Sequence, residues 1–144
     1  MRICIEERRR QKMRISEVSY VDRAEKVIKE LVEESKNRKK GKIEIVTTSK
    51  IRNLLAMTAD IYNQVLIHQS EKLTDELNGR IEYLRVRFIY ECGREQTVKD
   101  LVQKAEIIEI LKEIKGSKKN YILFSRYMEA LVAFRKFYGP KEKD

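Results

Sequence analysis

The stretch "GRIEYLRVRFIYECGRE" (residues 79–95) sets arginines seven residues apart in a segment otherwise full of apolar and aromatic side chains. In an α-helix, one face would carry the apolar row Leu77, Ile81, Leu84, Phe88 and Cys92. Arg80, Arg87 and Arg94 fall together about 100° from that row and roughly 10 Å apart along the axis. The stretch therefore predicts a helix with a core face and a separate row of arginines.

The same helix has a second apolar side. Tyr83, Val86 and Tyr90 lie nearly opposite the core row, with the arginines between the two faces. A helix that is apolar on two sides is either central or covered by a partner, so these three residues are a predicted partner interface. The arginines have two interpretations: they pair with carboxylates of neighbouring helices, or they contact a nucleic-acid backbone beside the tyrosines.

Helical periodicity continues on both sides of this segment. Further helices are expected at about residues 20–36, 47–69, 97–116 and 120–140, whereas "KIEIV" (42–46) is expected to be an extended connector. These lengths and the short connections predict an all-α fold, a single compact bundle of about five helices. The bundle domain is assigned to residues 20–144 and is preceded by a basic N-terminal extension, residues 1–19.

The charge of the chain implies an acidic partner. The net charge is +9 and the pI is about 9.5, which suits nucleic acid, an anionic membrane surface or an acidic protein face. The excess is concentrated in "RRRQKMR" (8–14) and "KNRKKGK" (36–42), although solvated tails and loops also have this composition. The helix start "TTSKIRN" (47–53), with Lys50 and Arg52, is a second candidate for anion contact or an ordinary N-cap.

Several function classes find no support in the residues. His68 is the only histidine, and neither a glycine-rich phosphate loop nor a nucleophile elbow is present, so no enzyme activity, cofactor or metal is expected. No apolar run approaches the length of a membrane span, and the first residues lack a secretory pattern. Cys4 and Cys92 are expected to be reduced thiols in a cytoplasmic protein.

Three stretches in order, "TTSKIRNLLAMTADIYNQV", "LRVRFIYECGRE" and "YMEALVAFRKFYG", resemble the small subunit of type III-A CRISPR–Cas effectors, the Csm complex. The resemblance spans residues 47–140, and residues 1–45 show no match. Members of this family are helical and occur in several copies, stacked as an inner filament that faces the backbone subunits holding the guide RNA. They position target RNA without cleaving it. Target cleavage belongs to the backbone subunit, and cyclic oligoadenylate synthesis and DNase activity belong to the large subunit.

The resemblance implies RNA-backbone contacts at Lys50, Arg52, Arg80, Arg87 and Arg94. Arg85 belongs to the second of the three stretches but lies near the core face of its helix. Arg126 and Arg135 are further basic positions in and beside the third stretch. The implied partners are target RNA, the guide–target duplex, the other Csm subunits and further copies of the chain, without a membrane or a small-molecule substrate.

Two other functions remain open at this point. A purely structural helical adaptor would direct its basic face at acidic protein partners and would not contact RNA. A basic DNA-binding regulator would need a helix–turn–helix recognition element, which the sequence does not show.

Overall fold

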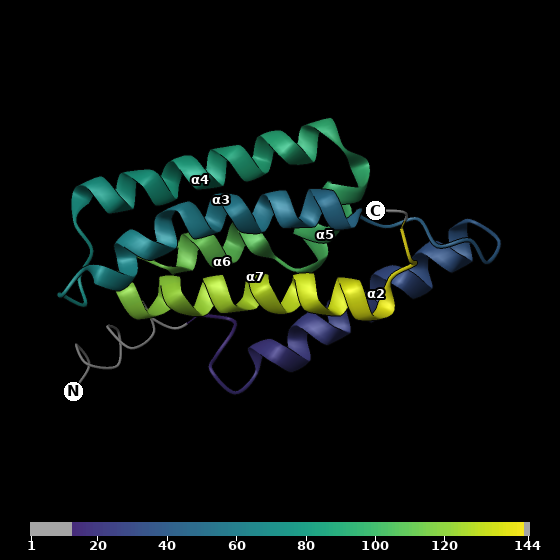
Figure 1. Ribbon diagram of the computed structural model, residues 1–144, viewed down its shortest axis with the longest axis horizontal. Helices are drawn as coiled ribbons and strands as arrows, with labels where there is room; N and C mark the ends of the chain where they lie inside the picture. Colours follow the sequence, from purple (N-terminus) through teal and green to yellow (C-terminus); the bar gives the residue numbers. More distant parts are fainter. Residues whose placement is uncertain (1–12, 143–144) are drawn as a thin grey trace.

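The computed structural model describes residues 13–142, which form six α-helices and no strand within that range. The helices are α2 (Tyr20–Arg38), α3 (Thr48–Ile67), α4 (Asp75–Arg94), α5 (Gln96–Lys104), α6 (Ile107–Glu113) and α7 (Lys118–Tyr138). The predicted all-α class is confirmed. Figure 1 shows α3 between α4 and α7, with α2 packed along α7 on the side away from α4.

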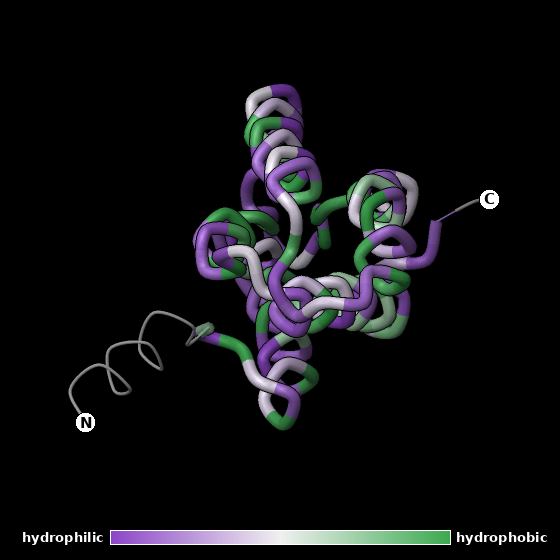
Figure 2. Tube along the Cα trace, turned by 90° about the vertical axis from the view of Figure 1, so that its left-hand side faces the viewer, coloured by the Kyte–Doolittle hydropathy of each residue, from purple (hydrophilic) through white to green (hydrophobic). Residues whose placement is uncertain are grey.

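The helices are amphipathic, and their apolar sides meet in one core. Figure 2, which views the bundle end-on, shows hydrophilic and hydrophobic residues interspersed around the turns of the chain. In α4, Leu77, Ile81, Leu84 and Phe88 are buried as the periodicity predicts, and the Phe88 ring meets Phe124 of α7 edge-on at 6.4 Å. Thr74 begins the helix by accepting a hydrogen bond from the Leu77 N–H at 3.2 Å. The contact between Phe88 and Phe124 in the core fixes which side of α4 faces outward.

The predicted connector at residues 42–46 is extended and contains neither helix nor strand, as expected. A buried serine of α2 holds it in place. Ser35 accepts a hydrogen bond from the Glu44 N–H at 2.6 Å and donates to the Glu44 carbonyl at 3.2 Å. Ile45 and Val46 are thereby buried against the bundle, so the connector delivers α3 at a fixed position.

The prediction of a single helix at residues 97–116 is wrong, because the chain forms two helices there, α5 and α6. The break lies at Glu106, whose φ of 58° is left-handed and cannot continue a right-handed helix. Tertiary contacts stabilise this strained residue. The buried Tyr127 hydroxyl donates to the Ala105 carbonyl at 2.9 Å, and Arg14 and Arg23 both pair with the Glu106 carboxylate.

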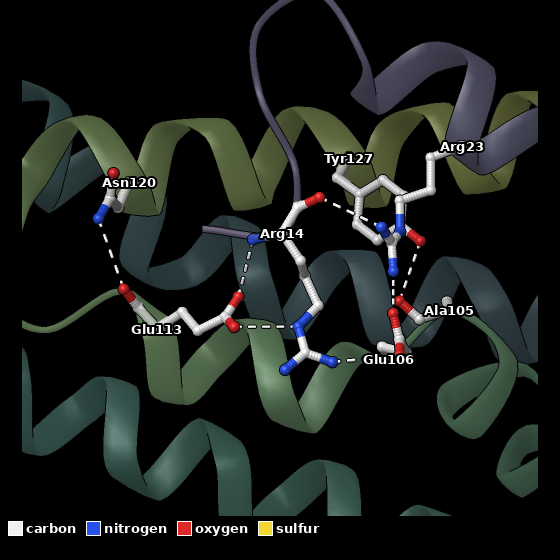
Figure 3. A network of polar contacts seen from close by, with 7 residues as sticks. All are labelled: Arg14, Arg23, Ala105, Glu106, Glu113, Asn120 and Tyr127. Carbon is white, nitrogen blue, oxygen red and sulfur yellow. Dashed lines mark hydrogen bonds and ion pairs between the residues drawn. The ribbon is translucent and has the colours of Figure 1, made fainter. Parts of the chain in front are cut away.

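Residues 13–19, here called the N-terminal strap, pack against the bundle (Figure 3). Met13 and Ile15 are buried, and between them Arg14 donates to Glu113 through its backbone N–H at 3.0 Å and its Nε at 2.9 Å. Most of the predicted basic extension, including the start of the cluster at 8–14, lies outside the described residues. The division between extension and bundle domain stays a prediction.

Candidate nucleic-acid interface

The neighbouring helices α3 and α4 border a groove that carries most of the predicted cationic residues. It consists of two hollows of about 420 and 290 Å³ that share Met57, Asp60 and Arg87 in their walls. Four of the five predicted RNA contacts line it: Lys50 from α3 and Arg80, Arg87 and Arg94 from α4. The structure therefore brings together the start of α3 and the arginine row of α4, which were two separate candidates for anion contact in the sequence.

The three arginines of the α4 row differ in the contacts that they make within the chain. Arg80 is half-buried and donates to the Gln64 side chain of α3. Arg94 pairs with Glu91 at 3.4 Å, and its guanidinium lies 5.7 Å from the centre of the Tyr90 ring. Arg87 is exposed and makes no hydrogen bond or ion pair with any described residue. Arg87, in the middle of the groove, is therefore the cation most available to an external anion.

The start of α3 is an N-cap, and one of its two predicted cations reaches the groove. The Thr47 hydroxyl accepts from the Lys50 N–H at 3.2 Å, and the Lys50 ammonium pairs with Glu95 at 2.8 Å. The hydrogen bond from the Lys50 ammonium to Glu95, followed by the charge of Lys50, lowers the pKa of the Glu95 carboxyl. Arg52 is exposed but does not line the groove.

Carboxylates share the groove with the arginines. Asp60 lines both hollows, Glu76 lines the larger one and Glu91 the smaller one. The periodicity of α4 could not reveal Asp60, because that requires knowing which face of α3 lies beside α4. None of the three arginines pairs with a carboxylate of a neighbouring helix among the described residues: Arg80 donates to Gln64, Arg94 pairs with Glu91 of its own helix, and Arg87 faces the groove unpaired.

The predicted partner interface lies on the outer surface of α4. Tyr83, Val86 and Tyr90 are 61%, 58% and 61% exposed, so the monomer does not cover them. Ile89, 53% exposed, adds to this apolar surface and was not predicted, although it adjoins Tyr90 and follows Val86 by three residues. We call these four residues the α4 apolar patch.

The remaining arginines of the three similar stretches lie outside the groove. Arg85 donates to Glu82 at 2.6 Å, and Arg126 is exposed beside a hollow at the start of α7. Arg135 is only 1% exposed and donates to the Val46 carbonyl at 2.6 Å. Its role is to hold the fold, so it is not an exposed cation of the kind its position in the third stretch suggested.

The described part of the chain contains neither a metal site nor a membrane-spanning helix. No group of three or more His, Cys, Asp or Glu side chains in residues 13–142 could hold a metal ion. Within the same range, no helix has the length and apolar character needed to cross a membrane.

The fold and the groove define a small, basic, all-helical protein with cations and carboxylates along one inter-helical groove. The family model described as "Csm2 Type III-A" matches residues 23–141. "CRISPR system Cms protein Csm2" of Streptococcus thermophilus is 44% identical over 128 residues, covering 89% of this chain and 98% of the relative. The protein of the same name from Mycobacterium tuberculosis (strain CDC 1551 / Oshkosh) is 38% identical over 131 residues, covering 91% and 100%.

The chain belongs to the Csm2 type III-A family, and it is thus a subunit of a type III-A CRISPR effector complex. Its partners therefore include other subunits of the Csm complex. The family match begins at residue 23, inside α2, whereas the resemblance in the sequence was placed only from residue 47 onward.

Proposed function

We propose that the chain is a non-catalytic, RNA-binding structural subunit of the cytoplasmic Csm complex. It forms the inner small-subunit filament and holds target RNA along the guide RNA, contacting the backbone and large subunits. Lys50, Arg80, Arg87 and Arg94 contact the RNA backbone, with Arg52 beside them at the start of α3. The observation that carries the proposal is the arginine row of α4, which meets Lys50 in one groove and leaves Arg87 unpaired.

The chemistry of the groove suits an RNA of any sequence. A subunit that must accept every target needs contacts to phosphate and sugar rather than to base edges. Guanidinium groups spaced roughly 10 Å apart along a helix can each take one phosphate. The groove carboxylates limit how tightly an isolated chain binds, because they repel phosphate. This favours modest affinity for the free chain and tighter contact in an assembly of several copies.

The test is fluorescence anisotropy with a labelled single-stranded RNA of about 30 nucleotides across a salt series. The wild type is compared with the triple variant Arg80→Ala/Arg87→Ala/Arg94→Ala. Loss of three phosphate contacts should weaken binding at low salt and reduce the slope of log affinity against log salt by about two units.

A second triple variant with the same loss of charge serves as the control. Lys112→Ala/Arg126→Ala/Lys136→Ala removes three exposed cations outside the groove that make no ion pair with a described residue. It should retain most of the affinity and slope. Equal losses in both variants would mean that net charge, rather than the groove, attracts RNA.

We assign the α4 apolar patch to the contact with a neighbouring copy in the filament. Val86→Glu places a charge in the centre of the patch, where the side chain is exposed and the monomer does not need it. Sedimentation velocity at rising concentration should show association of the wild type that Val86→Glu abolishes, at an unchanged melting temperature. Identical sedimentation of the two proteins would refute this assignment.

The alternative function is a purely structural adaptor whose basic face binds acidic protein partners. The carboxylate partners of Lys50 and Arg94, Glu95 and Glu91, are compatible with it, since they are the kind of group that an acidic protein would present to these cations. The adaptor predicts no salt-sensitive RNA binding by the wild type, so the same anisotropy series separates the two functions.

A further inference from the structure

The C-terminal residues 139–142 fold back onto the start of α3. In Figure 1 this segment, drawn in yellow, rises from the end of α7 toward the first turn of α3. The Glu142 carboxylate makes two contacts there: its Oε2 accepts from the Thr48 N–H at 3.0 Å, and its Oε1 pairs with the Arg135 Nη2 at 2.6 Å. A side chain 94 residues away in sequence therefore satisfies one of the free N–H groups of this helix end.

Arg135 makes the fold-back a built feature rather than a loose tail. Its Nε donates to the Val46 carbonyl at 2.6 Å and its Nη1 to the Pro140 carbonyl at 3.3 Å, so one guanidinium holds both the connector before α3 and the chain after α7. Burial lowers the pKa of Arg135, and the charge of Glu142 opposes this shift. A buried guanidinium needs a carboxylate beside it, which gives the tail a reason to stay docked.

The backbone after α7 runs close to the Arg135 side chain. A Cβ built on Gly139 would overlap the Arg135 guanidinium and would lie 2.6 Å from the Arg135 carbonyl oxygen. The chain therefore passes directly over the guanidinium it binds. We call residues 139–142, held by Arg135, the C-terminal latch.

The latch lies at the same end of the molecule as the basic residues of the α3 start. Thr48, which Glu142 contacts, is two residues before Lys50, a residue of the groove, and four before Arg52. The carboxylate therefore contacts the first turn of the helix that carries Lys50, and charges so placed on one helix end are only partly screened at ordinary salt. It lowers the positive potential at this end of the groove, where the helix dipole and Lys50 would otherwise favour a phosphate.

We propose that the C-terminal latch is an autoinhibitory contact, in which the Glu142 carboxylate covers the start of α3 and weakens the hold of this groove end on an RNA backbone. The inference rests on the proposed function, because it concerns the same groove. In the free chain, Glu142 acts as an internal anion, and RNA that reaches the α3 start must compete with it. In this way the latch keeps isolated copies from binding RNA as tightly as the groove residues allow.

The test compares RNA binding by the wild type, Glu142→Gln and the control Glu129→Gln, by the same anisotropy assay. Gln keeps the hydrogen-bonding shape and removes the charge. Glu129 is exposed on α7 and makes no hydrogen bond or ion pair with a described residue, so its variant has the same change in net charge at a different place. Glu142→Gln should bind about two- to fivefold more tightly at low salt, the range expected for one partly exposed charge. The gain should shrink at high salt.

The outcomes separate the two proposals. If the wild type binds RNA but Glu142→Gln gains no more than Glu129→Gln, the latch proposal is overturned and the proposed function stands. If none of the three proteins binds RNA, both are overturned. Thermal denaturation of each variant shows whether the binding temperature lies below unfolding, and the additional variant Lys141→Ala, which keeps Glu142, should bind no more tightly than the wild type.

Discussion

Replacing Arg135 by methionine tests whether a buried cation stabilises this bundle. Arg135 makes three hydrogen bonds, to the Val46 carbonyl, the Pro140 carbonyl and the Glu142 carboxylate. Removing one partner of a buried pair costs about 3–5 kcal/mol. Two features place the cost of Arg135→Met at the lower end of this range. Methionine fills part of the space of the arginine, and the Glu142 side chain, which is 31% exposed, can be hydrated again. The expected loss in the free energy of unfolding is about 3 kcal/mol.

Urea denaturation followed by circular dichroism measures this loss. For a chain of 144 residues, about 3 kcal/mol corresponds to a melting temperature lower by roughly 9 °C. A double-mutant cycle with Glu142→Gln then isolates the pair, and the two changes should be coupled by about 1–3 kcal/mol because the groups are in contact. A loss below about 1 kcal/mol, or additive single changes, would contradict the assigned role of Arg135.

Two further predictions concern glycines and a surface carboxylate. Gly139→Ala should destabilise the fold by about 1–3 kcal/mol, because the added Cβ would overlap the Arg135 guanidinium. Gly93→Ala in α4 should stabilise the fold by about 0.5–1 kcal/mol, because the added Cβ would meet no atom within 4 Å. Thermal denaturation of both variants tests the two signs. The Glu95 pKa is lowered by Lys50, so this pair stabilises the fold above the ordinary pKa of glutamate and loses its effect as pH falls through the lowered value. In Lys50→Met, an NMR titration should find the Glu95 pKa raised toward the ordinary value, and an unchanged value would exclude Lys50 as the cause.

The fold class and the faces of α4 could be predicted because both follow from local periodicity. Phe88 is buried and Tyr83 is exposed where the helical wheel places them. The break between α5 and α6 could not be predicted, since Glu106 is neither glycine nor proline and owes its left-handed φ to Arg14, Arg23 and Tyr127 from distant segments.

The candidate site was predictable to the same extent. The spacing of Arg80, Arg87 and Arg94 is a local pattern, and it leads to one side of one helix. The opposing wall, with Asp60, depends on how α3 packs beside α4. Arg135 shows the converse, because a cation near a helix end looks exposed in sequence, and the connector before α3 and the tail after α7 bury it.

The N-terminal strap has a consequence for how the chain folds during synthesis. Arg14 finds its partner Glu113 only after 99 further residues have been made, so the strap cannot dock on a nascent chain that lacks α6. Contacts of such long sequence separation form late in folding. Until then the buried side chains of Met13 and Ile15 stay uncovered, and a growing chain exposes them to chaperones and to other nascent chains.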